Sequence, residues 1–187
     1  RGRQIAFENS KGKYIISNLD LDDVFKPVLS KILKIYHQFL EGYVVAINKP
    51  PYWSGITIGP RKLLEELGGW RDLQFSEDWD LWARAAKIGK FKVLPFELRK
   101  KVGIKGEGGV IQKLLQRFIK YRENYRLGRR IFIQGENVNF FQRIISYLAY
   151  LASFFYSSYR DPFNNKFSAF NKQYVIDITI SEEQSLE

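Results

Sequence analysis

Short apolar runs alternate with amphipathic segments over the first hundred residues, and this alternation constrains the fold more than any other feature. The apolar runs have the length and character of buried strands, which are expected at 13–19, 42–47 and 53–58. Amphipathic helices are expected at 24–40, 60–67 and 77–88, and residues 91–102 look extended. Strands that alternate with helices predict an α/β fold with a mixed or parallel sheet flanked by helices.

The second half of the chain has a different pattern. A glycine-rich linker at 103–109 precedes two long helical patterns, at 110–127 and 138–159, and one β-like run follows at 174–180. We therefore expect an α/β region, a basic and aromatic helical appendage, and a tail with one possible strand, spanning 1–102, 103–171 and 172–187.

Composition limits the chemistry that the chain can perform. The sequence contains no cysteine, which excludes a disulfide, a thiolate metal site and a cysteine nucleophile. His37 is the single histidine, so a bound metal would use mainly oxygen ligands, as Mg²⁺ and Mn²⁺ prefer. The chain also lacks methionine and begins with Arg1, which suggests that residue 1 is not the natural start of the protein.

The segment Asp20-Leu21-Asp22-Asp23 follows the first expected strand. Side chains two residues apart in an extended segment point the same way, so Asp20 and Asp22 would project together from the strand end. In α/β sheets this is where ligands bind, and two such carboxylates suit a divalent ion that also holds a diphosphate. Alternatively, Asp23 caps the following helix and the segment is an ordinary turn.

A second acidic segment, Ser76-Glu77-Asp78-Trp79-Asp80, begins the helix expected at 77–88, with Ser76 as its cap. Acidic residues in a first helical turn often only complement the helix dipole. The same dipole would keep Asp78 ionised, and an ionised carboxylate near a hydroxyl group can act as a general base. Neither segment decides between these alternatives by itself.

Taken together and in order, the segments resemble those of the family 2 glycosyltransferases. That family typically shows an arginine–asparagine pair, a K/A-G-E-Y-I segment, a strand ending in D-x-D-D, a G-G-F/W-D element and an E-D-x-D-L-x-x-R helix. The matching segments here are Arg3-Gln4, Lys11-Gly12-Lys13-Tyr14-Ile15, Asp20-Leu21-Asp22-Asp23, Leu67-Gly68-Gly69-Trp70 and Glu77-Asp78-Trp79-Asp80-Leu81-Trp82-Ala83-Arg84. The resemblance covers Arg1 to about Pro95, with Gln4 where asparagine is usual.

The resemblance implies a GT-A fold and an inverting transfer of a sugar from a nucleotide-diphosphate donor to an acceptor hydroxyl. Asp20 and Asp22 would hold Mn²⁺ or Mg²⁺ against the donor diphosphate. Asp78 would take the proton of the acceptor hydroxyl. Glu77 would orient Asp78 or a group of the acceptor. The remaining implied positions are Arg3, Asp20 and Asp23 on the donor side, and Trp53 and Trp70 as sugar-stacking residues on the acceptor side.

One departure from the family concerns its first strand–helix–strand half, which binds the nucleotide base and has no counterpart in this sequence. We expect that the chain is a piece of a longer protein; a partner chain that completes the site and a non-catalytic module are the alternatives. A metal-dependent phosphotransferase or nuclease that uses Asp20, Asp22 and Asp78 would belong to another functional class.

The net charge of +10 is concentrated between Arg99 and Arg130, which predicts contact with a polyanion or an anionic membrane, or a solvated helix face. The uncharged aromatic stretch 144–159 is too short for a bilayer span. It predicts either an in-plane helix at a membrane surface or a helix packed on the α/β region through Ile144, Leu148, Leu151 and Phe155. We expect a cytoplasmic enzyme with a glycan or lipid-linked acceptor; the membrane alternative places it at the membrane surface and favours the lipid-linked acceptor. A basic nucleic-acid-binding protein is the other alternative, disfavoured by the acidic segments.

Overall fold

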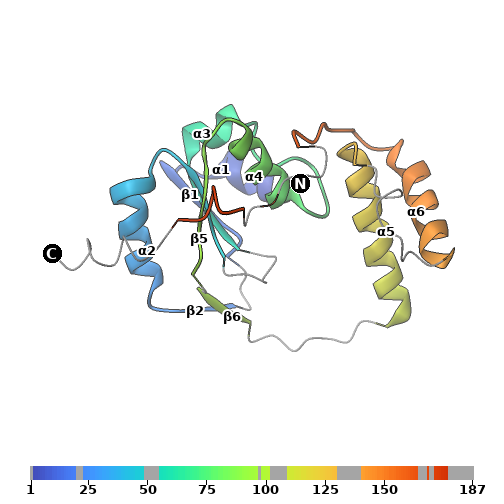
Figure 1. Cartoon of the computed structure of the whole chain (residues 1–187), viewed down its shortest axis with the longest axis horizontal. Helices are drawn as coiled ribbons and strands as arrows, with labels where there is room; N and C mark the ends of the chain where they lie inside the picture. Colours follow the sequence, from blue (N-terminus) through green and yellow to red (C-terminus); the bar gives the residue numbers. More distant parts are fainter. Residues whose placement is uncertain are drawn as a thin grey trace.

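The computed structural model of the chain describes residues 2–19, 23–48, 55–96, 98–101, 109–129, 140–163, 168 and 171–176. The helices are α1 (Gly2–Asn9), α2 (Leu29–Ile35), α3 (Arg61–Glu66), α4 (Glu77–Lys87), α5 (Val110–Arg126) and α6 (Phe140–Ser153). The strands are β1 (Tyr14–Ser17), β2 (Asp23–Phe25), β3 (Val44–Ile47), β4 (Ile56–Pro60), β5 (Phe91–Leu94) and β6 (Arg99–Lys101). Figure 1 shows the first hundred residues as a layered α/β body with α5 and α6 beside it.

Four strands form one mixed sheet in the order β1–β4–β3–β5. Strand β4 is antiparallel to both of its neighbours, whereas β3 and β5 are parallel. The register places Ile58 between Ile16 and Val45, so the apolar centres of three strands lie side by side. Val175 forms a parallel bridge to Val93 of β5, which brings the beginning of the strand expected at 174–180 to the sheet; residues from 177 on lie outside the described ones.

Helices cover both faces of this sheet because successive strand residues point to opposite sides. On one face, α1, α3 and α4 pack on the sheet through a core that includes Phe7, Ile15, Val44, Ala46, Leu64, Leu81, Trp82 and Phe91. On the other face, α2 and the turn that follows it bury Ile32, Tyr36 and Leu40 against Val45, Ile47, Ile58 and Leu94. Figure 1 shows this division. The predicted mixed sheet flanked by helices is therefore confirmed.

The helix expected at 24–40 begins later than predicted. Residues Asp23–Phe25 instead form β2, which pairs antiparallel with Arg99–Lys101 of β6 in a separate two-stranded sheet. Pro27 has no backbone N–H and disfavours a helical conformation in the residue before it, so α2 begins at Leu29. Its last turn, Tyr36–Leu40, is π-helical, and this leaves Phe39 52% exposed rather than on the buried face.

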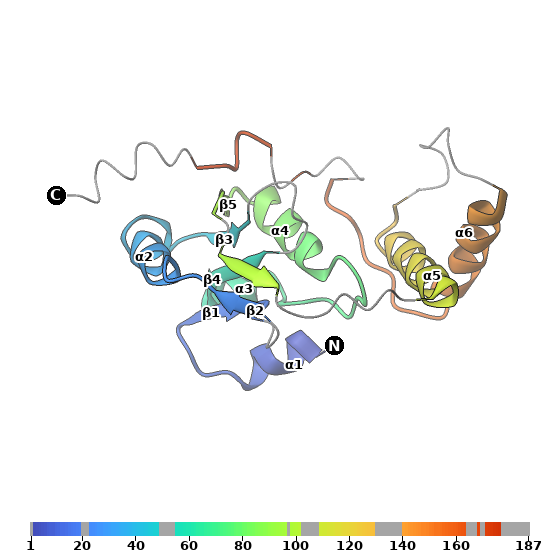
Figure 2. The same ribbon diagram turned by 90° about the horizontal axis from the view of Figure 1, so that it is seen from below.

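The helical pair, α5 and α6, lies to one side of the α/β layer in both views (Figures 1 and 2). Tyr125 joins the two helices, since its hydroxyl lies 2.8 Å from Ser146 Oγ and its ring contacts Tyr150 edge-on. The chain after α6 returns along α5, where Tyr159 N–H donates to Arg126 O and Asp161 accepts from Arg129. The predicted C-terminal helices are thus present, and α6 is shorter than its pattern suggested. Within the described residues, no helix has the length and apolar character needed to span a membrane.

Candidate active site

Helix α4 begins with the acidic residues that the sequence singled out. Ser76 precedes it with a left-handed backbone (φ 63°), and its carbonyl accepts the N–H of Asp80. The Ser76 side chain makes no capping bond, so the predicted capping role of this hydroxyl is wrong. The left-handed backbone at Ser76 changes the direction of the chain sharply just before α4. The first turn of α4 carries Glu77, Asp78 and Asp80.

Asp78 is held by two groups that come from elsewhere in the chain. Arg3 of α1 donates through Nη1 to Asp78 Oδ2 at 2.8 Å and to Glu77 Oε1 at 2.5 Å. The indole Nε1 of Trp70 lies 3.2 Å from Asp78 Oδ1. The Asp78 side chain is 16% exposed and that of Arg3 is 36% exposed, so the carboxylate is largely withdrawn from water while the guanidinium reaches the surface.

Burial raises the pKa of Asp78 above its usual value. The Arg3 guanidinium opposes this effect, the neighbouring Glu77 carboxylate adds to it, and hydrogen bonds from the Trp70 and Asn18 side chains also favour the ionised form. Burial prevails, so the carboxyl group keeps its proton to a higher pH than an exposed aspartate does. Once ionised, it is a stronger base than an ordinary aspartate.

Helix α1 carries Arg3 and is fixed to the rest of the site by Gln4. Gln4 Oε1 accepts the backbone N–H of Trp70 at 2.7 Å. Gly69 makes this approach possible, because a Cβ at this position would overlap Gln4 Oε1. Gly68 and Gly69 both have left-handed backbones, with φ of 78° and 63°. The Gly-Gly-Trp segment is therefore a tight turn against which α1 docks.

Asp80 and Arg84 of α4 attach the Gly-Gly-Trp turn to this helix. Asp80 is 1% exposed, and its carboxylate accepts from Arg71 Nη1 at 2.9 Å and from Arg84 Nε at 3.0 Å. Arg84 also donates to the carbonyl oxygens of Leu67 and Gly69. These contacts attach the turn to α4, so we assign Asp80 and Arg84 to support of the site rather than to chemistry.

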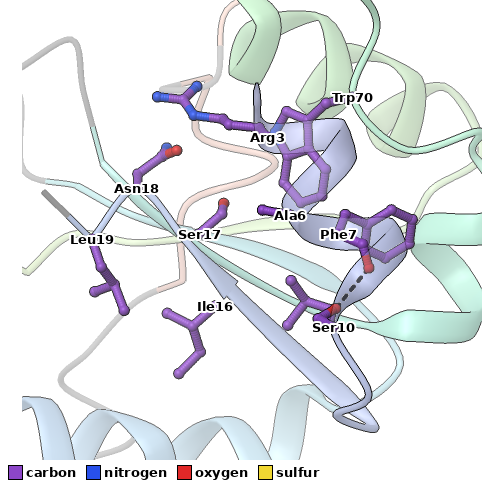
Figure 3. Close-up of a pocket in the computed structure, with 10 residues that line it drawn as sticks. Arg3, Ala6, Phe7, Ser10, Ile16, Ser17, Asn18, Leu19 and Trp70 are labelled. Carbon is purple, nitrogen blue, oxygen red and sulfur yellow. Dashed lines mark hydrogen bonds between the residues drawn. The ribbon is translucent and has the colours of Figure 1, made fainter. Parts of the chain in front are cut away.

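A pocket with a volume of about 250 Å³ lies between α1 and the carboxyl end of β1. Its lining includes Arg3, Phe7, Ile16, Ser17, Asn18 and Trp70 (Figure 3). Ser17 Oγ and Asn18 Oδ1 are the two buried side-chain polar atoms without a hydrogen-bond partner within the part of the chain that the structure describes. Buried polar atoms normally find a partner, so these two indicate a place where a ligand or water supplies one.

The pocket adjoins Asp78 through two shared residues. Arg3 and Trp70 line the pocket and also bind the Asp78 carboxylate. Asn18 is in a left-handed conformation (φ 67°), and its Nδ2 donates to Gly55 O at 2.7 Å, which fixes the amide at the pocket wall. A hydroxyl-bearing ligand in this pocket would thus lie near a base, a cation and two free acceptor atoms.

The remaining predicted site residues are only partly described. Asp20, Asp22 and Trp53 lie outside the described residues, and Asp23 is described in its backbone alone, as the first residue of β2. Trp70 is 3% exposed, so its ring face is not free to stack on a sugar; the Gly-Gly turn places it inside, against Phe7 and Asp78. No group of three or more histidine or acidic side chains that could hold a metal ion is present among the residues that the structure describes.

Ser17, Asn18 and the docking role of Gln4 were not predicted from the sequence. Serine and asparagine beside a strand end are common turn residues, and only the left-handed preference of asparagine hinted at a special backbone at position 18. Gln4 and Trp70 are 66 residues apart, and no local sequence pattern predicts the contact between them.

Comparisons with protein-family models, with curated proteins and with solved structures found no match to this chain. A function must therefore be inferred from the site itself, from the chemistry of its residues and their geometry.

Proposed function

We propose that the chain is part of an inverting, metal-dependent glycosyltransferase of the GT-A fold, which transfers a sugar from a nucleotide-diphosphate donor to an acceptor hydroxyl. The observation that supports this most is the Asp78 carboxylate. It is buried, has a raised pKa and is bound by Arg3 and Trp70, which line a pocket at the end of a sheet strand. An inverting transfer requires one such base, and the mixed sheet is compatible with the GT-A fold.

Asp78 would accept the proton of the acceptor hydroxyl. The acceptor oxygen would bond to the anomeric carbon of the donor sugar while the bond from that carbon to the diphosphate oxygen breaks. Each carboxylate oxygen has two acceptor positions. Arg3, Trp70 and Asn18 take three of these four positions, which leaves one for the hydroxyl group. Arg3 would also keep Asp78 ionised at the pH of the reaction, because its positive charge favours the carboxylate.

The pocket would bind a hydroxyl-bearing part of one substrate. Sugar hydroxyl groups can donate to Ser17 Oγ and to Asn18 Oδ1, the two acceptor atoms without a protein partner in the described part of the chain. Its volume of about 250 Å³ is below the ~300–1,000 Å³ typical of complete ligand sites. We therefore assign it to a single sugar unit rather than to a whole nucleotide sugar.

Mn²⁺ or Mg²⁺ would be held by Asp20 and Asp22, in keeping with the sequence resemblance. When bound, such an ion supplies positive charge to the departing diphosphate. Both aspartates lie outside the described residues.

The test is a thermal-shift screen of the chain with UDP, GDP and TDP, each with and without Mn²⁺. A nucleotide at about 100 times its Kd stabilises a protein by ~2.7 kcal/mol, which is ~5–10 °C for a chain of this length. We expect a shift of this size with one nucleotide and only with Mn²⁺. Asp22→Asn should abolish it, and Glu66→Gln, at an exposed carboxylate on α3, should not.

The outcomes separate the alternatives. Equal nucleotide binding by Asp22→Asn would contradict the metal role. Ion-dependent hydrolysis of nucleotides without sugar transfer would favour a phosphotransferase or nuclease. No shift with any nucleotide would count against a donor site in this chain.

A further inference from the structure

Helix α6 is turned so that its buried positions are mostly small residues and most of its large apolar residues are exposed. The buried positions are Ile145, Ser146, Ala149 and Ser153, which face α5. The exposed positions form what we call the apolar stripe: Phe140, Phe141, Ile144, Tyr147, Leu148, Leu151, Phe154 and Phe155. These residues recur at helical spacing on the side away from α5. Monomeric proteins in water rarely expose so continuous an apolar surface.

The packing alternative for this segment is contradicted. It required Ile144, Leu148, Leu151 and Phe155 to contact the α/β region, but these side chains are 41%, 50%, 42% and 88% exposed. The described residues therefore do not cover the face that the sequence pattern marks as apolar.

The first half of α5 also exposes large apolar side chains. Val110, Ile111 and Leu115 are 74%, 82% and 55% exposed. Figure 1 shows that α5 and α6 run in the same direction, so these residues lie toward the end of the pair at which both helices begin.

The exposed charges on the two helices all have the same sign. They are Lys113, Arg117, Lys120 and Arg143. Arg143 is one turn from both Phe140 and Tyr147 and therefore borders the apolar stripe. The acidic residue Glu123 is 1% exposed and is held between Arg122 and Arg126. Those two arginines are neutralised internally, so only part of the basic block from 99 to 130 is available to a partner.

We propose that the helical pair docks on an anionic lipid surface, with the apolar stripe at the level of the headgroups, Arg143 beside it, and the exposed lysine and arginine side chains of α5 attracting the lipid phosphates over a longer distance. An in-plane helix needs this combination of an apolar face and basic flanks. A second copy of the chain would place four like charges opposite four others. Nucleic acid would leave the phenylalanine and leucine side chains in water. The proposal depends on the helical pair alone and not on the proposed function.

The experiment is flotation of the chain with neutral phosphatidylcholine vesicles and with vesicles that also contain an anionic phospholipid. Each lysine or arginine near an anionic surface strengthens binding about fivefold at low salt. The double variant Arg117→Gln/Arg143→Gln should therefore bind anionic vesicles about 25-fold more weakly. The matched control Lys31→Gln/Lys34→Gln removes the same charge from exposed positions of α2, on the far side of the sheet, and should bind as the parent does.

Binding at high salt tests the apolar stripe. Each phenylalanine fully withdrawn from water strengthens binding about tenfold or more, so Phe140→Ser/Phe155→Ser should remove the salt-resistant fraction. Phe39→Ser is the control, since Phe39 is 52% exposed on the opposite side of the molecule. This variant should keep the salt-resistant fraction of vesicle binding. Circular dichroism confirms that each variant is folded.

Three results would overturn the proposal. The first is no flotation of the parent chain at low salt. The second is duplex DNA binding that exceeds vesicle binding at matched ionic strength. The third is a stable dimer in sedimentation analysis that Phe140→Ser/Phe155→Ser converts to a monomer.

Discussion

Replacement of Gly69 by alanine tests how α1, and with it Arg3, is attached to the site. Gly69 has a left-handed backbone (φ 63°), and a Cβ there would overlap Gln4 Oε1. Gly68 has a similar φ of 78° but faces open space. The two glycines therefore form a matched pair, in which the backbone strain is shared and the contact with Gln4 belongs to Gly69 alone.

The expected magnitudes follow from these differences. Alanine in a left-handed conformation costs ~1–2 kcal/mol, and this applies to both positions. At Gly69 the new methyl group also displaces Gln4 from the Trp70 N–H, and loss of that hydrogen bond costs a further ~0.5–1.5 kcal/mol. We expect Gly69→Ala to destabilise the chain by ~2–3 kcal/mol, about 1 kcal/mol more than Gly68→Ala. In thermal unfolding this excess is ~2–4 °C.

Urea denaturation of both variants, alone and combined with Gln4→Ala, measures the effect. In the Gln4→Ala background the contact has already been removed, so the excess cost of Gly69→Ala should disappear. Equal costs for Gly68→Ala and Gly69→Ala in the parent background would refute the reasoning, because the Gln4 contact would then contribute nothing to the attachment of α1.

Three further predictions concern Asp78. Asp78→Asn should lower turnover of the complete enzyme by ~10²–10⁴, the usual contribution of a general base, with donor affinity little changed; comparable loss of donor affinity would make Asp78 a ligand instead. Because its pKa is raised, the acid limb of kcat/KM should lie above the ordinary aspartate range and should be absent in Asp78→Asn. The raised pKa also means that the folded state holds this proton more tightly than the unfolded state does. The contribution of Asp78 to stability is therefore present below its unfolded pKa and is lost as the pH rises through the folded pKa. Urea unfolding at a series of pH values measures this loss. Between the two pKa values, the free energy of unfolding should depend less on pH in Asp78→Asn than in the parent chain.

The sequence predicted the strands and most helices because their signals are local. The apolar runs became β1, β3 and β4, and the predicted first and last residues of α3 and α4 lie within a residue or two of the structure. The helix at 24–40 failed at its start, because pairing of Asp23–Phe25 with Arg99–Lys101 depends on residues more than seventy positions away. Helix α1 was not predicted, since its eight residues carry a weak amphipathic pattern and are held mainly by Arg3, Gln4 and Phe7.

The candidate site was predictable in its residue types but not in its contacts. Glu77, Asp78 and Arg3 were selected by resemblance, and the structure brings them together across 74 and 75 residues. Apart from the family resemblance, nothing in the sequence distinguishes Asp78, whose partners Arg3 and Trp70 line the pocket, from Asp80, which two arginines neutralise one half-turn later. The two carboxylates differ because Arg71 and Arg84 pair with Asp80 and not with Asp78. The packing of α4 on the Gly-Gly turn determines this pairing.

The position of Trp70 gives this molecule a built-in optical probe. Its indole ring contacts Phe7, lines the pocket and donates to Asp78, and it is 3% exposed. The emission of a buried indole responds to charge at its N–H, so fluorescence from Trp70 should follow the ionisation of Asp78 and the filling of the pocket. Trp82 is equally buried but donates to the uncharged hydroxyl group of Thr57, and its emission should stay constant in the same titration. The chain also contains Trp53 and Trp79, so in a Trp53→Phe/Trp79→Phe variant the occupancy of the site can be followed without a label and before the substrate is known.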